Sequence, residues 1–284
     1  MPPLAQDEYW KNRHEKQARR ATNTSSARRR GVRGYLDALR IWRGAQPCQS
    51  HAEFCFHKIL KSHLPHREDW SAIEIGCSPG GHLVTLHKIF GYCPHGVEYA
   101  ESGVEVTRQT FVENGLDPEN IIHADFFAPS FQTTYSGKFD VVYSWSFLEH
   151  FENANDVVRK HMNLVRQGGY FVCAIPNIKG IIYPILSLLC KDFVRAHNTG
   201  IMKMEPFRSL FEGELFETRY CGPVGVLGFH GTSYMKSKGA LTGLAGNILD
   251  RGQDLFDNVM FLFLGNRLGK TRLSPWLVFI GRRL

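Results

Sequence analysis

The sequence EIGCSPGG spans Glu74–Gly81 and joins two segments of different character. Residues 72–76 have the apolar composition of a buried strand, and residues 81–90 are predicted to form a helix. Small residues in the connecting turn let the backbone approach a ligand, and the N-terminus of the following helix offers N–H groups to it. This strand–turn–helix unit therefore indicates a ligand-binding α/β domain.

The alternation of strands and helices continues downstream. Four further strands are predicted at residues 96–99, 121–124, 139–144 and 170–175, and helices at 102–114 and 156–166. The last of these helices is expected to stop at Gly168 and Gly169. Later strands are predicted at 215–221 and 276–282, whereas 178–214 and 231–270 have helical character. This order predicts a mostly parallel sheet with helices on both faces.

The positive charge of the chain lies at one end. Residues 1–45 hold eleven Lys and Arg against four Asp and Glu, which accounts for the whole net charge of +7. The remaining residues hold 23 basic and 23 acidic side chains. We therefore expect two parts, a basic helical N-terminal segment or lid at 1–66 and an α/β domain at 67–284, with a helical insertion at about 178–214.

An acidic residue lies at the end of the second predicted strand, at a spacing from the glycine turn that suggests ribose binding. Glu98 lies 22 residues after Gly76, where a carboxylate can accept hydrogen bonds from both hydroxyls of a ribose. Nicotinamide enzymes share this arrangement, but here Ser78 replaces the middle glycine that close approach to a pyrophosphate requires. A nucleoside ligand without phosphate tolerates that replacement better.

Together these motifs resemble those of class I S-adenosylmethionine-dependent methyltransferases, in particular the small-molecule enzymes that include the quinone methyltransferases. Residues 70–177 carry the resemblance. It implies a Rossmann-like, seven-stranded, mostly parallel sheet flanked by helices, with an N-terminal helical segment and a helical insertion after the fifth strand. It also implies S-adenosyl-L-methionine as the cofactor.

The resemblance assigns residues to the cofactor site. The acid and glycines of the first motif match Glu74, Gly76 and Gly80, and Glu98 matches the ribose-binding acid. Asp125 matches an acid that contacts adenine, with Phe126 as an apolar wall for the ring. The full set of predicted cofactor-binding residues is Glu74, Gly76, Cys77, Gly80, Glu98, Tyr99, Asp125, Phe126, Ser144 and Trp145.

The exit from the fourth strand is predicted to hold the catalytic group. In the family this loop borders the methyl-transfer site, and here it contains His150. Histidine titrates near neutral pH and suits removal of an acceptor proton. Tyr143, in the strand itself, is the nearby rival. The loop lacks the Asn/Asp-Pro-Pro-aromatic signature used for amino groups of DNA bases, which argues against a nucleobase N-methyltransferase.

The acceptor site is expected in the insertion at 178–214. This apolar segment contains one adjacent uncharged polar pair, His197 and Asn198, which we predict to contact the acceptor. A basic N-terminal arm above it favours an acceptor with a carboxylate or phosphate, although a solvated arm without contact to the site explains the charge equally well. The methylated atom, oxygen, nitrogen or carbon, stays open.

No metal site is expected. Histidines crowd residues 51–66, but no carboxylates accompany them at ligand spacing. The seven cysteines form no CxxC pair, and buried free thiols in a reducing cytoplasm are the simplest interpretation. The first residues lack the pattern of a signal peptide, which favours a cytoplasmic protein.

Three alternatives accompany the small-molecule methyltransferase. The apolar stretches 181–190 and 259–264, together with the basic arm, suit peripheral membrane contact and a lipid-linked or glycan acceptor. A nucleic-acid-binding methyltransferase would use the arm on phosphate, but interleaved aromatic residues are missing there. A cofactor-binding protein without catalytic activity is the third alternative.

Overall fold

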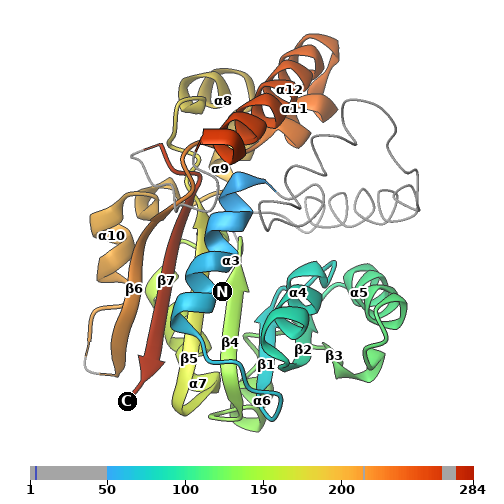
Figure 1. The fold of residues 1–284 in the computed structure, drawn as a ribbon, viewed down its shortest axis with the longest axis vertical. Coiled ribbons are helices and arrows are strands. Elements are labelled where there is room, and N and C mark those ends of the chain that lie inside the picture. Colours follow the sequence, from blue (N-terminus) through green and yellow to red (C-terminus); the bar gives the residue numbers. More distant parts are fainter. Residues whose placement is uncertain (1–3, 5–49, 214, 264–272) are drawn as a thin grey trace.

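The computed structural model describes residues 4, 50–213, 215–263 and 273–284. Within these ranges the chain builds a seven-stranded sheet. The strands are β1 (Ser71–Ile75), β2 (Cys93–Glu98), β3 (Ile121–His123), β4 (Phe139–Trp145), β5 (Val165–Pro176), β6 (Phe216–Val224) and β7 (Trp276–Arg283). Their spatial order is β3-β2-β1-β4-β5-β7-β6, with β7 antiparallel to both of its neighbours and the remaining pairs parallel (Figure 1). The predicted Rossmann-like fold class is confirmed.

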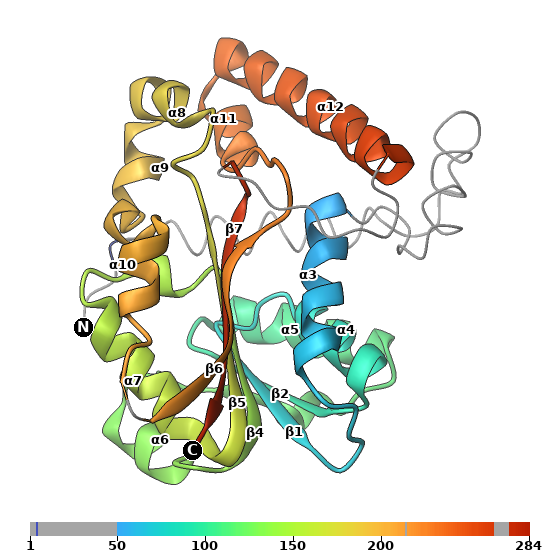
Figure 2. The ribbon, with the colours of Figure 1, turned by 60° about the vertical axis from the view of Figure 1, so that its left-hand side comes forward.

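Helices cover both faces of this sheet and one of its ends (Figure 2). The helices are α3 (His51–His63), α4 (Gly81–Phe90), α5 (Glu101–Glu113), α6 (Pro129–Thr134), α7 (Ala154–Leu164), α8 (Tyr183–Leu189), α9 (Lys191–Arg195), α10 (Met204–Ser209), α11 (Thr232–Lys238) and α12 (Ala240–Phe263). Short 3-10 turns lie at Pro118–Asn120, Leu148–His150 and Thr199–Ile201. The sequence predicted most of these helices but missed α6.

The described end of the predicted N-terminal segment packs into a hydrophobic core against the sheet. Helix α3 buries Phe56, Ile59 and Leu60 against sheet residues that include Val172 and Val278. Its start is fixed by a capping box, in which Ser50 and Glu53 each accept a hydrogen bond from the other's backbone N–H. Apart from Leu4, the basic arm at 1–45 lies outside the described residues, so its proposed role as a lid stays a prediction.

The helix predicted to end at Gly168 and Gly169 ends earlier. Helix α7 stops at Leu164, and β5 begins at the next residue. The two glycines lie inside β5, near the register shift between Phe139 and Val141 on the neighbouring strand. A Cβ on Gly169 would lie 2.7 Å from the backbone oxygen of Asp140, so this glycine allows two strands to approach rather than ending a helix.

The helices at one end of the sheet form a cap over its functional edge. Pro176, the last residue of β5, pairs with Trp276, the first residue of β7, and Val224 at the end of β6 pairs with the same residue. The segments after β5 and β6 therefore leave from the carboxyl ends of the parallel strands, where α/β sheets bind ligands. Helices α8, α9, α11 and α12 gather there (Figure 1). Among the described helices, α12 included, none combines the length and the apolar character needed to cross a membrane.

The close contact at Gly169 generates a stability prediction. Alanine in a strand is ordinarily favoured over glycine, but here Gly169→Ala would press its methyl group on backbone oxygens of Asp140 and Arg166 at 2.7 and 3.0 Å. We expect a loss of about 1–3 kcal/mol in the free energy of unfolding, measured by urea titration. Gly180→Ala is the control, since its nearest contact is 3.6 Å away, and equal stability of the two variants would contradict the packing argument.

Candidate active site

The glycine turn after β1 owes its shape to two left-handed residues. Gly76 has φ +69° and Gly80 has φ +88°, conformations that glycine adopts without strain. The Gly76 N–H donates to the Val97 oxygen at 3.0 Å, which ties the turn to β2. A Cβ on Gly76 would lie 2.8 Å from the ring of Phe147, whereas one on Gly81 would meet nothing within 4 Å. Gly76 therefore makes room for a protein ring, and the open space lies at Gly81.

Two acidic side chains converge behind this turn. Glu74 and Glu98 are both buried. Burial, and then the nearby Glu98, raise the pKa of Glu74 well above its usual range. Burial also raises the pKa of Glu98, although backbone N–H groups oppose this by stabilising the carboxylate. The Glu74 Oε2 has no hydrogen-bond partner among the described residues. This pair favours a positively charged ligand group.

Glu98 also has a structural role that the sequence did not reveal. Its Oε1 accepts hydrogen bonds from the N–H groups of Tyr99 and Ala100, each at 3.0 Å, and Ala100 is the N-cap residue of α5. The carboxylate thereby satisfies backbone donors at the helix start. Its predicted contact with a ribose would use the second oxygen.

Two predicted cofactor residues next to these acids differ in their exposure. The Cys77 side chain is buried against Gly96, where a Cβ would lie 2.5 Å from the sulfur, and burial raises the pKa of the thiol well above its usual range. Cys77 can therefore serve a ligand only through its backbone. Tyr99 is exposed, and its backbone oxygen lies 3.0 Å from His123 Nε2.

Asp125 and Phe126 are adjacent in the segment after β3, but their side chains lie in different environments. Asp125 is exposed, and its Oδ1 accepts a hydrogen bond from the Phe127 N–H at 2.8 Å, which fixes a tight turn. Phe126 is buried in the main core, with its ring centroid 4.7 Å from that of His161. The half-buried ring at this edge is Phe127. Adenine contacts by Asp125 and Phe126 stay predictions.

Strand β4 shows that Tyr143 is a core residue. Its side chain is fully buried among α3 and the sheet, and burial, with smaller contributions from neighbouring acids, raises its pKa well above the ordinary value. Burial and a raised pKa do not support Tyr143 as a base, and its role as the rival to His150 stays a prediction. Ser144 is also buried, and the Trp145 ring, at the strand end, lies 4.6 Å from His82 and 4.1 Å from Trp276.

A left-handed residue turns the chain immediately after β4. Ser146 has φ +51°, unusual for a residue with a side chain, and its N–H donates to the Ala174 oxygen at 2.9 Å. The following residues place the Phe147 ring against Gly76 and lead into the 3-10 turn at Leu148–His150. One loop therefore connects the glycine turn to His150.

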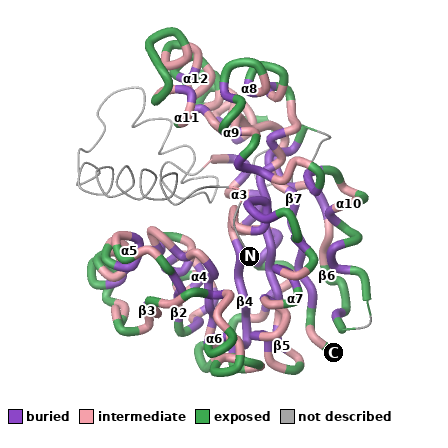
Figure 3. Tube along the Cα trace, turned by 180° about the vertical axis from the view of Figure 1, so that it is seen from behind, coloured by how far each residue is buried: buried purple, intermediate pink, exposed green. Residues whose placement is uncertain are grey.

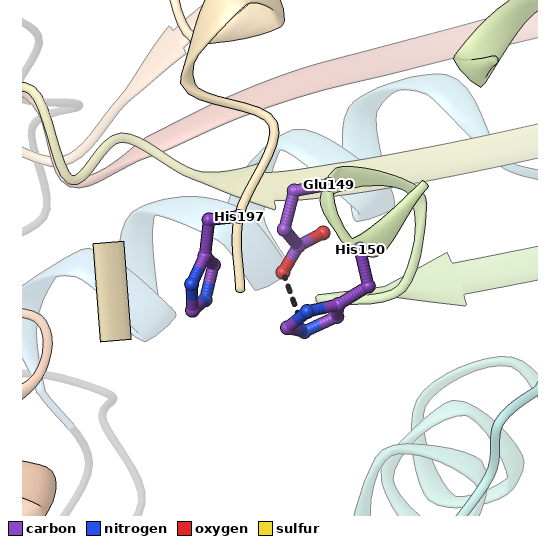
Figure 4. Close-up of side chains that lie close together, drawn as sticks. All are labelled: Glu149, His150 and His197. Atoms are coloured by element: carbon purple, nitrogen blue, oxygen red, sulfur yellow. Dashed lines mark ion pairs between the residues drawn. The ribbon is translucent and has the colours of Figure 1, made fainter. Parts of the chain in front are cut away.

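His150 lies in a buried polar cluster with Glu149 and His197 (Figure 4). All three residues are buried, and His150 Nε2 lies 3.7 Å from Glu149 Oε1. The ring centroids of His150 and His197 are 4.6 Å apart. The structure thus brings together His150 and His197, two predicted site residues that are 47 positions apart in the sequence.

Backbone carbonyls fix the orientation of both imidazole rings. The Nδ1 of His150 lies 2.8 Å from the Ala196 oxygen, and that of His197 lies 2.6 Å from the Phe193 oxygen. A carbonyl can only accept, so each Nδ1 carries the proton. In the neutral rings the lone pair is then on Nε2.

The side chain of Asn198 is hydrogen-bonded to backbone groups of two segments. Its Nδ2 donates to the backbone oxygens of Phe151 and Glu152 at 3.0 and 3.2 Å, and its Oδ1 accepts from the Gly200 N–H at 3.2 Å. Its backbone N–H donates to the Glu149 oxygen at 2.5 Å. These bonds use both polar atoms of the side chain and join the insertion to the β4 exit. They do not support the predicted acceptor contact, which stays a prediction.

Glu149 is the site residue that the sequence interpretation missed. An acid directly before the candidate histidine was a usable signal. Its burial could not be anticipated, because the covering insertion begins nearly thirty residues later.

The comparisons with known proteins agree with this geometry. Residues 73–173 match the family model described as a methyltransferase domain. The chain therefore contains a methyltransferase domain, of the class I S-adenosylmethionine-dependent type that its motifs resemble. The matched part runs from β1 into β5 and so includes the glycine turn, Glu98 and the β4 exit with Glu149 and His150.

Solved structures share the fold of this methyltransferase. A geranyl diphosphate methyltransferase in complex with S-adenosylmethionine has 15% identity and a TM-score of 0.51, with 92% of this chain and 93% of that chain covered. An S-adenosylmethionine-dependent methyltransferase from Thermotoga maritima has 14% identity and a TM-score of 0.51, covering 89% and 98%. The MccD protein has 13% identity and a TM-score of 0.53, covering 82% and 97%. No curated protein matches the chain in a sequence search.

The position of Glu98 generates a binding prediction for this methyltransferase. In Glu98→Gln the amide oxygen can still accept hydrogen bonds from the N–H groups of Tyr99 and Ala100. The amide nitrogen cannot accept a hydrogen bond from a ribose hydroxyl. We expect S-adenosylmethionine binding to weaken by about 1.5–3 kcal/mol, or roughly 10- to 150-fold in Kd, measured by calorimetry. Glu101→Gln, at an exposed position in the first turn of α5, is the control. Equal affinity for both variants would remove Glu98 from the cofactor site.

Proposed function

We propose that this methyltransferase modifies a small-molecule acceptor held beneath the cap helices, and that His150 orients the acceptor or takes its proton. The observation that carries the proposal is the link between the two halves of the site. The Phe147 ring contacts the glycine turn, and the buried cluster of Glu149, His150 and His197 begins two residues further along the same loop.

Charge at the glycine turn supports S-adenosylmethionine as the group bound there. The ligand carries a sulfonium, an ammonium and a carboxylate, and is therefore positive overall. Glu74 and Glu98 are buried together, and Glu74 has an oxygen without a described partner. A cationic ligand compensates such a pair, whereas a dinucleotide pyrophosphate would add negative charge to it. The open space at Gly81 suits close approach of the ligand to the start of α4.

Methyl transfer requires the protein mainly to align the acceptor with the methyl group of the cofactor. An electron pair on the acceptor attacks the methyl carbon, the carbon–sulfur bond breaks, and its electrons stay on sulfur, which becomes a neutral thioether. The acceptor loses a proton during or after this step. His150 suits the task of receiving that proton or holding the acceptor in line, because its ring is fixed by the Ala196 carbonyl and presents Nε2 to the cluster.

His150→Asn tests this role with little change to the framework. The Asn amide nitrogen occupies the place of Nδ1 and can still donate to the Ala196 oxygen, while Nε2 is lost. We expect turnover to fall by about 10²–10⁴-fold and the Kd for S-adenosylmethionine to stay unchanged. His66→Asn, at an exposed histidine between α3 and β1, is the control. Turnover is measured as S-adenosylhomocysteine formed with an acceptor found by metabolite screening. Wild-type turnover by His150→Asn would make His150 a structural residue.

A lipid-linked acceptor is the second candidate, and the surface of the cap favours it. The side of α12 turned to solvent carries large apolar residues at roughly heptad spacing, and the α8 region adds others (Figure 3). These residues are Ile181, Ile185, Leu188, Leu189, Leu241, Leu244, Ile248, Leu255, Leu262 and Phe263. An exposed apolar stripe at the end of the sheet that holds the site suits contact with a lipid surface.

Vesicle co-sedimentation separates the two candidates. Replacing Ile248 and Leu255 together by Gln removes two exposed apolar side chains from the stripe. Because burial of each is worth about 1.5–3 kcal/mol, we expect vesicle partitioning to fall at least about ten-fold, with Asn247→Gln on the same helix as the control. Wild-type protein that stays in the supernatant, with and without anionic lipid, would exclude the lipid-surface candidate.

A further inference from the structure

We propose that Glu149, His150 and His197 form a binding site for a divalent transition-metal cation such as Zn²⁺, which holds the acceptor through an oxygen or nitrogen lone pair. The role toward the acceptor rests on the proposed function. Cation binding itself does not, because it depends only on these three side chains.

The ligand atoms of the cluster are already close together. One nitrogen or oxygen from each residue lies within 4.8 Å of the others, and all three side chains point toward a common centre (Figure 4). Ligand atoms about 2.1 Å from a tetrahedral zinc lie roughly 3.4 Å apart. The separation of 3.7 Å between Glu149 Oε1 and His150 Nε2 is near that value, so modest side-chain rotation completes the site.

Both histidines have the second hydrogen bond that is typical of metal ligands. A metal-bound imidazole almost always donates its other N–H to a carbonyl or carboxylate, which fixes the tautomer and the ring orientation. Here Ala196 and Phe193 supply those carbonyls, at 2.8 and 2.6 Å from Nδ1 of His150 and His197. In that tautomer Nε2 of each ring carries the lone pair through which an imidazole binds a metal.

The two segments that carry the ligands are joined by backbone bonds. The backbone N–H of Asn198, one residue after His197, donates to the backbone oxygen of Glu149. The Asn198 side chain donates to the backbone oxygens of Phe151 and Glu152. Ligands held by such a framework lose little conformational freedom on binding a cation. Asn198 is thus a positioning residue for the site.

The donor set selects the class of cation. Two imidazole nitrogens and one carboxylate suit Zn²⁺, Co²⁺, Ni²⁺ or Fe²⁺, whereas Mg²⁺ and Ca²⁺ prefer oxygen ligands. His161 provides a contrast within the same fold. It is buried and its Nδ1 lies 2.8 Å from the Val157 carbonyl, but it belongs to no such group of ligands among the described residues.

Three protein ligands leave a position for the acceptor. A cation there attracts a lone pair on the acceptor and lowers the pKa of the group that bears it. An acceptor hydroxyl or amine would then release its proton to water while the new bond to the methyl carbon forms and the carbon–sulfur bond breaks. The site therefore favours oxygen or nitrogen acceptors over carbon acceptors, and His150 acts by orientation through the cation.

Cobalt binding tests the site without reference to activity. The full chain, purified without a histidine tag and freed of metal with a chelator, is titrated with Co²⁺ and followed by visible absorption. We expect one equivalent of Co²⁺ to give ligand-field bands of a site with nitrogen ligands, and Zn²⁺ to abolish them. Folded protein that gives no such bands, and that retains no Zn²⁺ by elemental analysis, would overturn the proposal.

Matched variants assign the ligands. His150→Asn and His197→Asn each keep a donor in place of Nδ1 and lose Nε2, and Glu149→Gln removes the carboxylate charge. We expect each to weaken Co²⁺ binding at least about 100-fold, which exceeds the roughly 10- to 100-fold loss typical when only a supporting group of a metal site is removed. His161→Asn makes the same change at a buried histidine outside the cluster and should bind Co²⁺ as the wild type does. Wild-type Co²⁺ affinity in all three cluster variants would place the cation elsewhere and overturn the assignment.

Calorimetry with S-adenosylmethionine on the metal-free protein keeps the two proposals separate. Cofactor binding without cation binding would overturn the metal site and leave the proposed function standing. Cation binding without cofactor binding would overturn the proposed function, while the coordination site would stand.

Discussion

The contact between the Phe147 ring and the backbone of Gly76 is the constraint on which the site depends. A Cβ at residue 76 would come within 2.8 Å of that ring, and the left-handed conformation of Gly76 excludes most side chains as well. Through this contact the glycine turn, which we propose faces the cofactor, and the loop that carries Glu149 and His150 are packed as one unit. The left-handed Ser146 makes it possible by turning the chain sharply after β4.

Charge is distributed unequally between the two halves of the site. Behind the glycine turn, two buried carboxylates with raised pKa values favour a cationic ligand. At the β4 exit, one carboxylate lies with two imidazoles whose protons are directed to backbone carbonyls. The first half thus suits a sulfonium donor, and the second suits lone-pair chemistry with an acceptor. A methyl transfer requires both within reach of each other.

Some side chains have roles that their position in the sequence did not indicate. Tyr143 lies only two residues from the end of β4, but strand alternation turns it into the core beneath α3. Asn198 adjoins His197, but its polar atoms satisfy backbone groups across the gap between two segments. Gly169 resembles a helix terminator, but it is needed where β5 approaches Asp140. In each case a contact distant in sequence overrides the local signal.

The sequence by itself determined the alternation of strands and helices, the turn at Glu74–Gly81 and the place of Glu98 at the end of β2. It also singled out His150 as a candidate. These inferences depend on short-range periodicity and spacing and on the motif resemblance. Tertiary structure alone decided that His197 would meet His150, that Glu149 would be buried, and that an apolar stripe of α12 would face solvent. The physical reason is that burial and ligand geometry arise when the segment after β5 folds back over the β4 exit. No local pattern encodes the hydrogen bonds that hold it there.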